Sequence, residues 1–124
     1  MKYKTVWKGL CQWVLVALLM LIVTAAQADR AVLVGQVKRI LVTTEHFGGC
    51  MALLSENPKI KLPSCGGGWV TFSCDGTYTS KDVAYRMLDQ AQMALALGKN
   101  AYVVVDDTRR HNGYCFAYRI DIVR

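Results

Sequence analysis

The sequence lacks the motifs that would name a reaction. It contains no nucleophile elbow, no HExxH pair and no paired acid and base, and the glycine triplet 66–68 is not followed by the Lys-Ser/Thr of a phosphate-binding loop. The four cysteines after residue 28 stand 15, 9 and 41 positions apart, so the C-x₂₋₄-C pairs of a zinc site are missing too. We therefore expect a protein that is not an enzyme and that holds no cofactor or metal.

The chain also lacks an apolar run long enough for a membrane span, which takes roughly 20 residues. Its longest unbroken run, Val14–Val23, is shorter, follows three lysines within the first eight residues, and ends close to Ala26-Gln27-Ala28. A positive start, a short apolar stretch and small residues at an A-x-A site are typical of a cleaved signal peptide. We predict that residues 1–28 are removed on export, and that the secreted or periplasmic mature form has no membrane span.

Residues 29–124, which remain when the predicted signal peptide is left out, carry little net charge. The whole chain carries a net charge of +6, but residues 29–124 carry only +3 and contain no basic tract. A surplus this small, without interleaved aromatic and basic residues, does not favour nucleic acid as a partner. No linker, repeat or low-complexity tract interrupts these 96 residues, so we expect residues 29–124 to form a single domain.

Four cysteines are present in this domain, and an even number in an exported chain of this size predicts two disulfides. Cys50 and Cys74 lie about equally far from the middle of the loop 56–68, so an antiparallel hairpin would bring them opposite each other. Cys65 is then left for Cys115. The favoured pairing is therefore Cys50–Cys74 with Cys65–Cys115, and the two other connectivities stay open.

Apolar residues at strand spacing predict five strands, and helical spacing predicts one helix between the third and the fourth. Gly35 interrupts the long first strand, which suggests a bend or bulge where one strand could serve two sheets. The order fits a mainly β fold with one helix, a small five-stranded OB-like barrel, with a β-rich α+β sandwich as the alternative. The expected strands are 31–44, 50–55, 69–75, 101–105 and 115–123.

Alternation within the strands predicts which side chains share a face. In the third strand, Val70, Phe72 and Cys74 are expected on one face. The polar segment 106–113, which ends in Asn-Gly, is expected to connect the last two strands. The last strand is expected to turn four side chains inward and three outward. The inward ones are Phe116, Tyr118, Ile120 and Ile122, and the outward ones are Ala117, Arg119 and Asp121.

The helix is predicted to begin at a capping box formed by Thr79 and Asp82 and to end at Gly98, which can adopt a positive φ. One apolar stripe has the helical spacing of a face packed on the barrel. Its members are Val83, Ala84, Met87, Leu88, Ala91, Ala94 and Leu95. The last turns carry a second apolar side, which we expect to lie at an interface between subunits. Its members are Met93, Ala96 and Leu97.

The segment Leu88-Asp89-Gln90-Ala91-Gln92, followed by Gly98 and the strand Val103-Val104-Val105, resembles the helix-to-strand region of bacterial AB5 toxin B subunits. The similarity is to B subunits of the subtilase-cytotoxin and typhoid-toxin type. Members of that family are homopentamers that bind sialylated or related glycans and accompany a catalytic toxin subunit. The resemblance implies the same assembly and ligand class for this chain, which has Val34 near the position of a serine in the family's glycan site.

The resemblance also implies a glycan site in the loop after the second strand, where this chain carries Ser55, Asn57 and Lys59. Tyr78 and Tyr114 are the candidate exposed aromatic residues, and sugars stack on such rings through their C–H faces. The leading hypothesis is an exported carbohydrate-binding, lectin-like subunit that forms a homo-oligomer. The alternative is a free-standing periplasmic or secreted binding module of unknown ligand, without a toxin partner.

Overall fold

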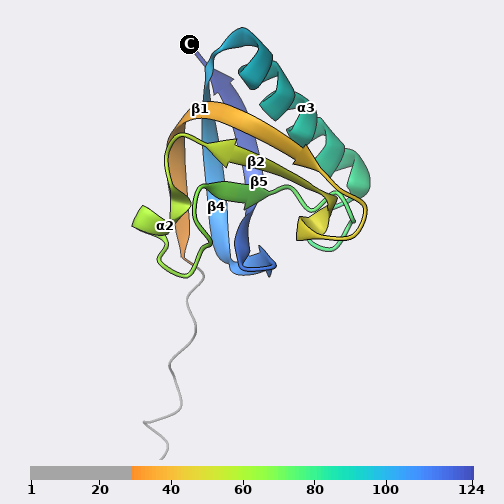
Figure 1. Cartoon of the computed structure of the whole chain (residues 1–124). Helices are drawn as coiled ribbons and strands as arrows, with labels where there is room; N and C mark the ends of the chain where they lie inside the picture. The colour runs from red at the N-terminus through yellow and green to blue at the C-terminus, as the bar shows by residue number, and fades with distance from the viewer. Residues whose placement is uncertain (1–28) are drawn as a thin grey trace, which may run out of the picture.

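The structure, a computed structural model, describes residues 29–124, and in it five strands close into a barrel (Figure 1). The barrel order is β1-β2-β3-β5-β4, and β4 pairs back to β1. All neighbours are antiparallel except β3 and β5, which are parallel. This arrangement confirms the predicted mainly β, five-stranded barrel, and the predicted signal peptide at 1–28 lies outside the described residues. The strands are β1 (Arg30–Val42), β2 (Cys50–Leu54), β3 (Trp69–Thr71), β4 (Asn100–His111) and β5 (Tyr114–Val123).

The long strand β1 belongs to both halves of the barrel. Residues 30–36 pair with β4, and residues from Val37 to Val42 pair with β2, with a register shift between Val37 and Arg39. Gly35 stands where the two pairings meet, and a Cβ there would lie only 2.3 Å from the Ser55 hydroxyl oxygen. Strand β1 therefore serves both halves of the barrel, as predicted, although its register shift lies just after Gly35 rather than at it. A side chain at Gly35 would prevent the close approach of β1 to the end of β2.

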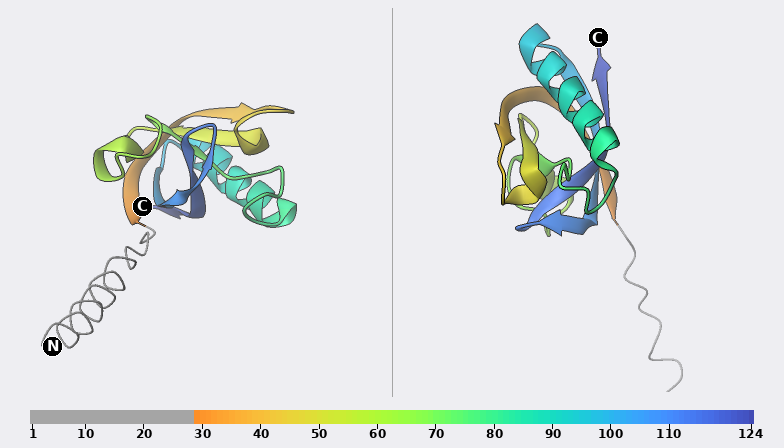
Figure 2. Two further views of the ribbon diagram at one scale, coloured as in Figure 1. Left: turned by 90° about the horizontal axis from the view of Figure 1, so that it is seen from below. Right: turned by 90° about the vertical axis from the view of Figure 1, so that its right-hand side faces the viewer.

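Three helical segments accompany the strands: η1 (Phe47–Gly49), α2 (Pro58–Lys61) and α3 (Lys81–Leu97). The long helix α3 packs mainly against β1 and β5, along one side of the barrel (Figures 1 and 2). Its N-cap is Ser80 rather than the predicted Thr79, because the Ser80 hydroxyl accepts the Val83 N–H. Gly98 ends the helix with a φ of 61°, as predicted.

The buried face of α3 is narrower than the sequence predicted. Val83 and Leu95 are exposed, so they flank the buried stripe instead of belonging to it. The side chains that pack on the barrel are Ala84, Met87, Leu88, Ala91 and Ala94. Three of these five are alanines, which allows the helix axis to lie close to the strands.

The prediction of a polar connection over 106–113 is wrong. Strand β4 continues to His111, and the turn to β5 consists of Asn112 and Gly113, whose φ angles are 53° and 85°. Positive φ at both central residues is the geometry that two-residue hairpins favour. Asp106, expected in the connection, is instead buried in β4.

A bulge in β5 changes the predicted alternation of that strand at Ala117 and Tyr118. Val104 pairs with Arg119 and Val105 pairs with Ala117, so Tyr118 has no partner on β4. Phe116, Ile120 and Ile122 lie in or against the core, as predicted, but the extra residue changes the face of its neighbour. Ala117 is consequently buried while Tyr118 is 37% exposed, the reverse of the expectation.

Strand β3 is also shorter than predicted, since it ends at Thr71 and Ser73 has a φ of 58°. Both Thr71 and Ser73 are buried along with Val70, Phe72 and Cys74, so the chain is covered on both sides after the strand ends. No helix within residues 29–124 has the length and apolar character to cross a membrane.

Two disulfides join Cys50 to Cys74 and Cys65 to Cys115, with Cα–Cα distances of 5.6 and 5.3 Å. This is the pairing that the sequence favoured. All four cysteines are buried in the core of the barrel, among Phe72, Phe116, Leu33 and the valines of β3 and β4. The disulfides support the oxidising environment expected of an exported protein.

We expect each disulfide to contribute about 3–4 kcal/mol to the free energy of unfolding, because each restricts the unfolded chain. The paired serine variant of Cys65 and Cys115 should lose more than that of Cys50 and Cys74, since the bridged residues are 50 rather than 24 positions apart. Urea unfolding monitored by circular dichroism measures both losses. Equal stability of either paired variant and the wild type would contradict the prediction.

Candidate ligand-binding site

A cavity of about 200 Å³ lies on the outer face of the barrel, over β2 and β3. Along β2, Cys50, Ala52 and Leu54 point into the core, so the alternate residue Met51 points out of the barrel. Three of the five side chains around the cavity are aromatic, and they cover Met51 so well that it is only 2% exposed. The lining residues are Leu41, Phe47, Met51, Trp69 and Tyr114.

Strand register brings these residues together from distant parts of the chain. Met51 lies opposite Leu41 on β1 and opposite Thr71 on β3. Trp69 precedes Thr71 by two residues and therefore lies on the same face of β3. The two remaining rings come from the connections at this end of the barrel: Phe47 from η1 and Tyr114 from the start of β5. Their ring centroids are 5.6 Å apart in an edge-to-face arrangement.

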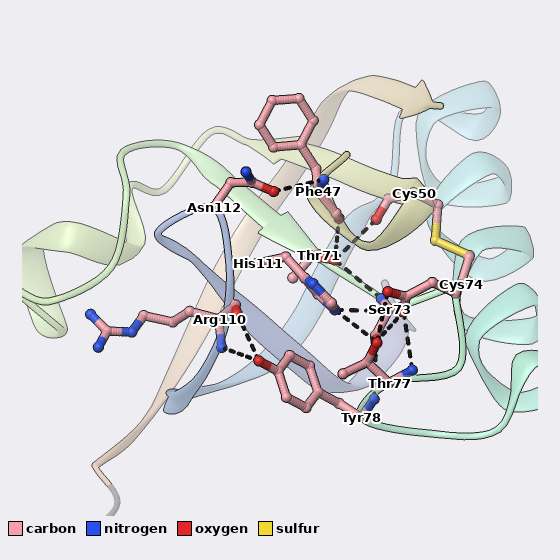
Figure 3. A network of polar contacts seen from close by, with 11 residues as sticks. Phe47, Cys50, Thr71, Ser73, Cys74, Thr77, Tyr78, Arg110, His111 and Asn112 are labelled. Atoms are coloured by element: carbon pink, nitrogen blue, oxygen red, sulfur yellow. Dashed lines mark hydrogen bonds and ion pairs between the residues drawn. A yellow bond between two sulfur atoms is a disulfide. The ribbon is translucent and has the colours of Figure 1, made fainter. Parts of the chain in front are cut away.

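Phe47 is held in an unfavourable backbone conformation, with a φ of 58°. A bulky residue at positive φ is a strained outlier that persists only where its surroundings fix it. The Phe47 N–H donates to the Asn112 side-chain oxygen at 3.0 Å, and the Thr71 hydroxyl donates to the Phe47 carbonyl at 2.7 Å (Figure 3). The β4–β5 turn and β3 thus fix the residue that carries one ring of the cavity.

A polar network lies beneath this turn and is centred on the buried hydroxyl of Ser73 (Figure 3). The hydroxyl donates to the Asp75 carboxylate at 2.8 Å and accepts the Tyr78 N–H at 3.1 Å. His111 Nε2 lies 3.0 Å from the same oxygen. With its proton directed at Asp75, the Ser73 hydroxyl can accept a hydrogen bond from Nε2 in the tautomer that carries a proton there.

Asp75 is the anionic member of the network. Burial raises the pKa of its carboxyl group, but hydrogen bonds from Thr77 and Ser73 outweigh that effect and hold the pKa below its usual value. Its carboxylate is therefore charged at neutral pH.

Tyr78 fastens the hairpin to the barrel. Its hydroxyl donates to the Arg110 carbonyl at 2.7 Å, and its ring lies 4.7 Å from that of His111 and 5.6 Å from that of Phe116. From the sequence we expected Tyr78 to be an exposed aromatic residue that contacts a ligand. The structure instead half-buries it and uses both its ring and its hydroxyl in internal contacts.

The three polar residues proposed after the second strand lie at the other end of β2, beside α2 (Figure 1). The Ser55 hydroxyl accepts the Gln36 N–H at 2.9 Å, and the Asn57 side-chain oxygen accepts the Lys59 and Gly68 N–H groups at 3.0 Å each. Lys59 is exposed on α2. None of these residues lines the aromatic cavity.

Of the proposed binding residues, the cavity contains Tyr114. Phe47 and Trp69 were missed as partners of Tyr114, although both adjoin glycine-rich turns, and that position was the signal available in the sequence. The glycine triplet 66–68 lies against the same side of the barrel as the aromatic cavity. A Cβ at Gly66 would lie 2.7 Å from the Tyr114 ring, so the loop closely approaches Tyr114.

No family model, curated protein or solved structure matches this chain. Among residues 29–124, no three His, Cys, Asp or Glu side chains gather as metal ligands would. The function is therefore inferred from the geometry of the cavity itself.

Replacing Asn112 with glycine should release Phe47 without disturbing the turn, because glycine accepts the positive φ of this position at no cost. Loss of the hydrogen bond is expected to lower the free energy of unfolding by about 1 kcal/mol. It should also speed hydrogen exchange of the Phe47 amide, which NMR measures. Asn112→Asp is the control, since it keeps the acceptor oxygen. Unchanged exchange at Phe47 in the glycine variant would contradict this role.

Proposed function

We propose that the domain binds carbohydrate in the aromatic cavity over β2 and β3. The observation that carries the proposal is the convergence of Phe47, Trp69 and Tyr114 around one small cavity. In OB-type barrels, ligands including oligosaccharides bind on the face of the second and third strands, between the first and last loops. The cavity occupies that place, since η1 follows β1 and Tyr114 follows the β4–β5 turn.

The size and lining of the cavity favour one sugar ring. Its volume of about 200 Å³ is below the roughly 300–1,000 Å³ of pockets that enclose drug-sized ligands. Aromatic rings offer flat apolar surface to the C–H face of a pyranose, and the hydroxyl groups then point to the rim. Arg39 is exposed on β1 two positions before Leu41, on the same face, and can donate hydrogen bonds there.

We extend the proposal to the assembly and partners of the protein. An exported lectin-like subunit resembling AB5 toxin B subunits would act by binding, in a homo-oligomer such as a pentamer, with a catalytic toxin subunit as a partner. The second apolar side of α3 supports assembly, because Met93 and Leu97 are 49% and 61% exposed and Ala96 is exposed between them. The alternative is a free-standing periplasmic or secreted binding module with the same cavity.

Trp69→Ala should weaken binding of any glycan that the wild-type protein selects on an array by at least about tenfold, since truncating a central aromatic residue typically removes that much affinity. Titration calorimetry with the selected glycan measures the change. Tyr118→Ala is the matched control, because Tyr118 is exposed outside the cavity. Undiminished binding by the Trp69 variant, or the absence of any glycan bound by the wild type, would refute the proposal.

Ala96→Glu should dissociate the oligomer while each barrel stays folded, because the new carboxylate would be buried without a partner at the interface. Light scattering gives the mass, and circular dichroism checks the fold. Ile60→Glu is the control, since Ile60 is a 78% exposed apolar residue on α2. A wild-type protein that is monomeric at high concentration would overturn the oligomer.

A further inference from the structure

A second and larger hollow lies between the end of β1 and the start of α3. It is a groove of about 480 Å³, and it lies on the opposite side of the β1–β2 connection from the aromatic cavity. Adjacent residues Leu41 and Val42 line the cavity and the groove, respectively, because successive side chains of a strand point to opposite faces. The groove is lined by Val42, Thr43, Thr44, Gly49, Cys74, Asp75, Lys81 and Tyr85.

One wall of the groove is held in place by covalent and main-chain links. The Cys50–Cys74 disulfide crosses from β2 to the chain after β3, and Cys74 forms part of the lining. The Asp75 N–H donates to the Gly48 carbonyl at 3.0 Å, and the Thr43 N–H donates to the Gly49 carbonyl at 2.9 Å. These links fix the wall that Thr43, Gly49 and Cys74 form, which lowers the entropic cost of binding on that side, while Lys81 and Tyr85 come from α3.

The chemistry of the lining combines an aromatic ring with hydrogen-bonding groups of both kinds. Tyr85 is 50% exposed and makes no aromatic or hydrogen-bond contact with other side chains in residues 29–124. The Lys81 side chain runs past Gly76, where an added Cβ would lie 3.4 Å from Lys81 Cγ, and its ammonium group forms no ion pair within the described part of the chain. Asp75 also lines the groove: its carboxylate accepts hydrogen bonds from Ser73 and Thr77, yet its side chain remains 42% exposed. Thr44 adds a hydroxyl group.

We propose that this groove binds a neutral hexopyranose residue. The sugar stacks its C–H face on the Tyr85 ring, donates a hydroxyl hydrogen bond to the Asp75 carboxylate and accepts a hydrogen bond from the Lys81 ammonium group. One carboxylate and one ammonium group leave the lining without net charge, so the groove offers no surplus charge that would select an acidic or an amino sugar. The site is independent of the aromatic cavity, and it gives the domain two places at which a branched or extended glycan can be held.

The test is residue-resolved NMR of the ¹⁵N-labelled protein titrated with methyl α-D-glucopyranoside, methyl α-D-galactopyranoside and methyl α-D-mannopyranoside. At least one of these probes should shift the amide signals of Thr44, Gly49 and Asp75. Tyr85→Ser should weaken that response by about tenfold, as expected when a contacting aromatic residue is truncated. Tyr118→Ser, which removes an exposed tyrosine elsewhere, and Trp69→Ala in the other cavity should both leave it unchanged.

Three outcomes would overturn the groove site. They are the absence of any shift with all three probes, shifts confined to Trp69 and Tyr114, and an equal loss in the Tyr85 and Tyr118 variants. Shifts confined to Trp69 and Tyr114 would leave the aromatic cavity supported, so failure of the two sites is distinguishable. Methyl β-D-glucuronide and methyl glucosaminide test the charge argument, and tighter binding of either than of every neutral probe would refute a neutral ligand.

Discussion

Closure of the barrel depends on how β3 and β5 are held together. Strand β3 has three residues and pairs with β5 at one position, where Thr71 lies opposite Phe116. The Cys65–Cys115 disulfide ties the chain before β3 to β5, and the Gly66 N–H donates to the Gly113 carbonyl at 2.7 Å. The Cys50–Cys74 disulfide secures the chain after β3 to β2. These covalent and main-chain links replace the ladder of hydrogen bonds that so short a strand cannot form.

The aromatic cavity derives its rigidity from these same links between β3 and β5. Trp69 begins β3, and Tyr114 precedes the cysteine that bridges to the loop before β3. Three non-glycine residues of the described structure have a positive φ. Phe47 lines the cavity, Asn112 holds the Phe47 amide, and Ser73 lies just after β3. Backbone strain of this kind costs free energy and persists where neighbouring contacts determine the conformation. Its concentration beside the cavity is what a preformed binding site requires, because rings that are already positioned lose little freedom when a ligand enters.

Features governed by local rules could be predicted from the sequence, and features governed by register could not. The disulfide pairing, the sharing of β1 between two partner strands near Gly35 and the helix end at Gly98 follow from spacing and from glycine geometry. The exposure of Tyr118 depends on a bulge, which shifts the phase of β5 without any residue that marks it. The cavity was equally hidden, since Phe47, Trp69 and Tyr114 are brought together by strand pairing rather than by proximity in the chain.

The connection at 43–49 forms a wall of both hollows, which places a limit on how they can vary. Phe47 faces the aromatic cavity, whereas Thr43, Thr44 and Gly49 face the groove. Gly48 between them is buried at a φ of 72°, and a Cβ there would lie 2.5 Å from the His111 ring and 2.8 Å from the Thr71 hydroxyl. A side chain at Gly48 would therefore disturb both walls and the polar network together. Residues on the far walls, Trp69 in one hollow and Tyr85 in the other, are free of this constraint, so the shape and chemistry of each hollow can change there while the shared connection stays fixed.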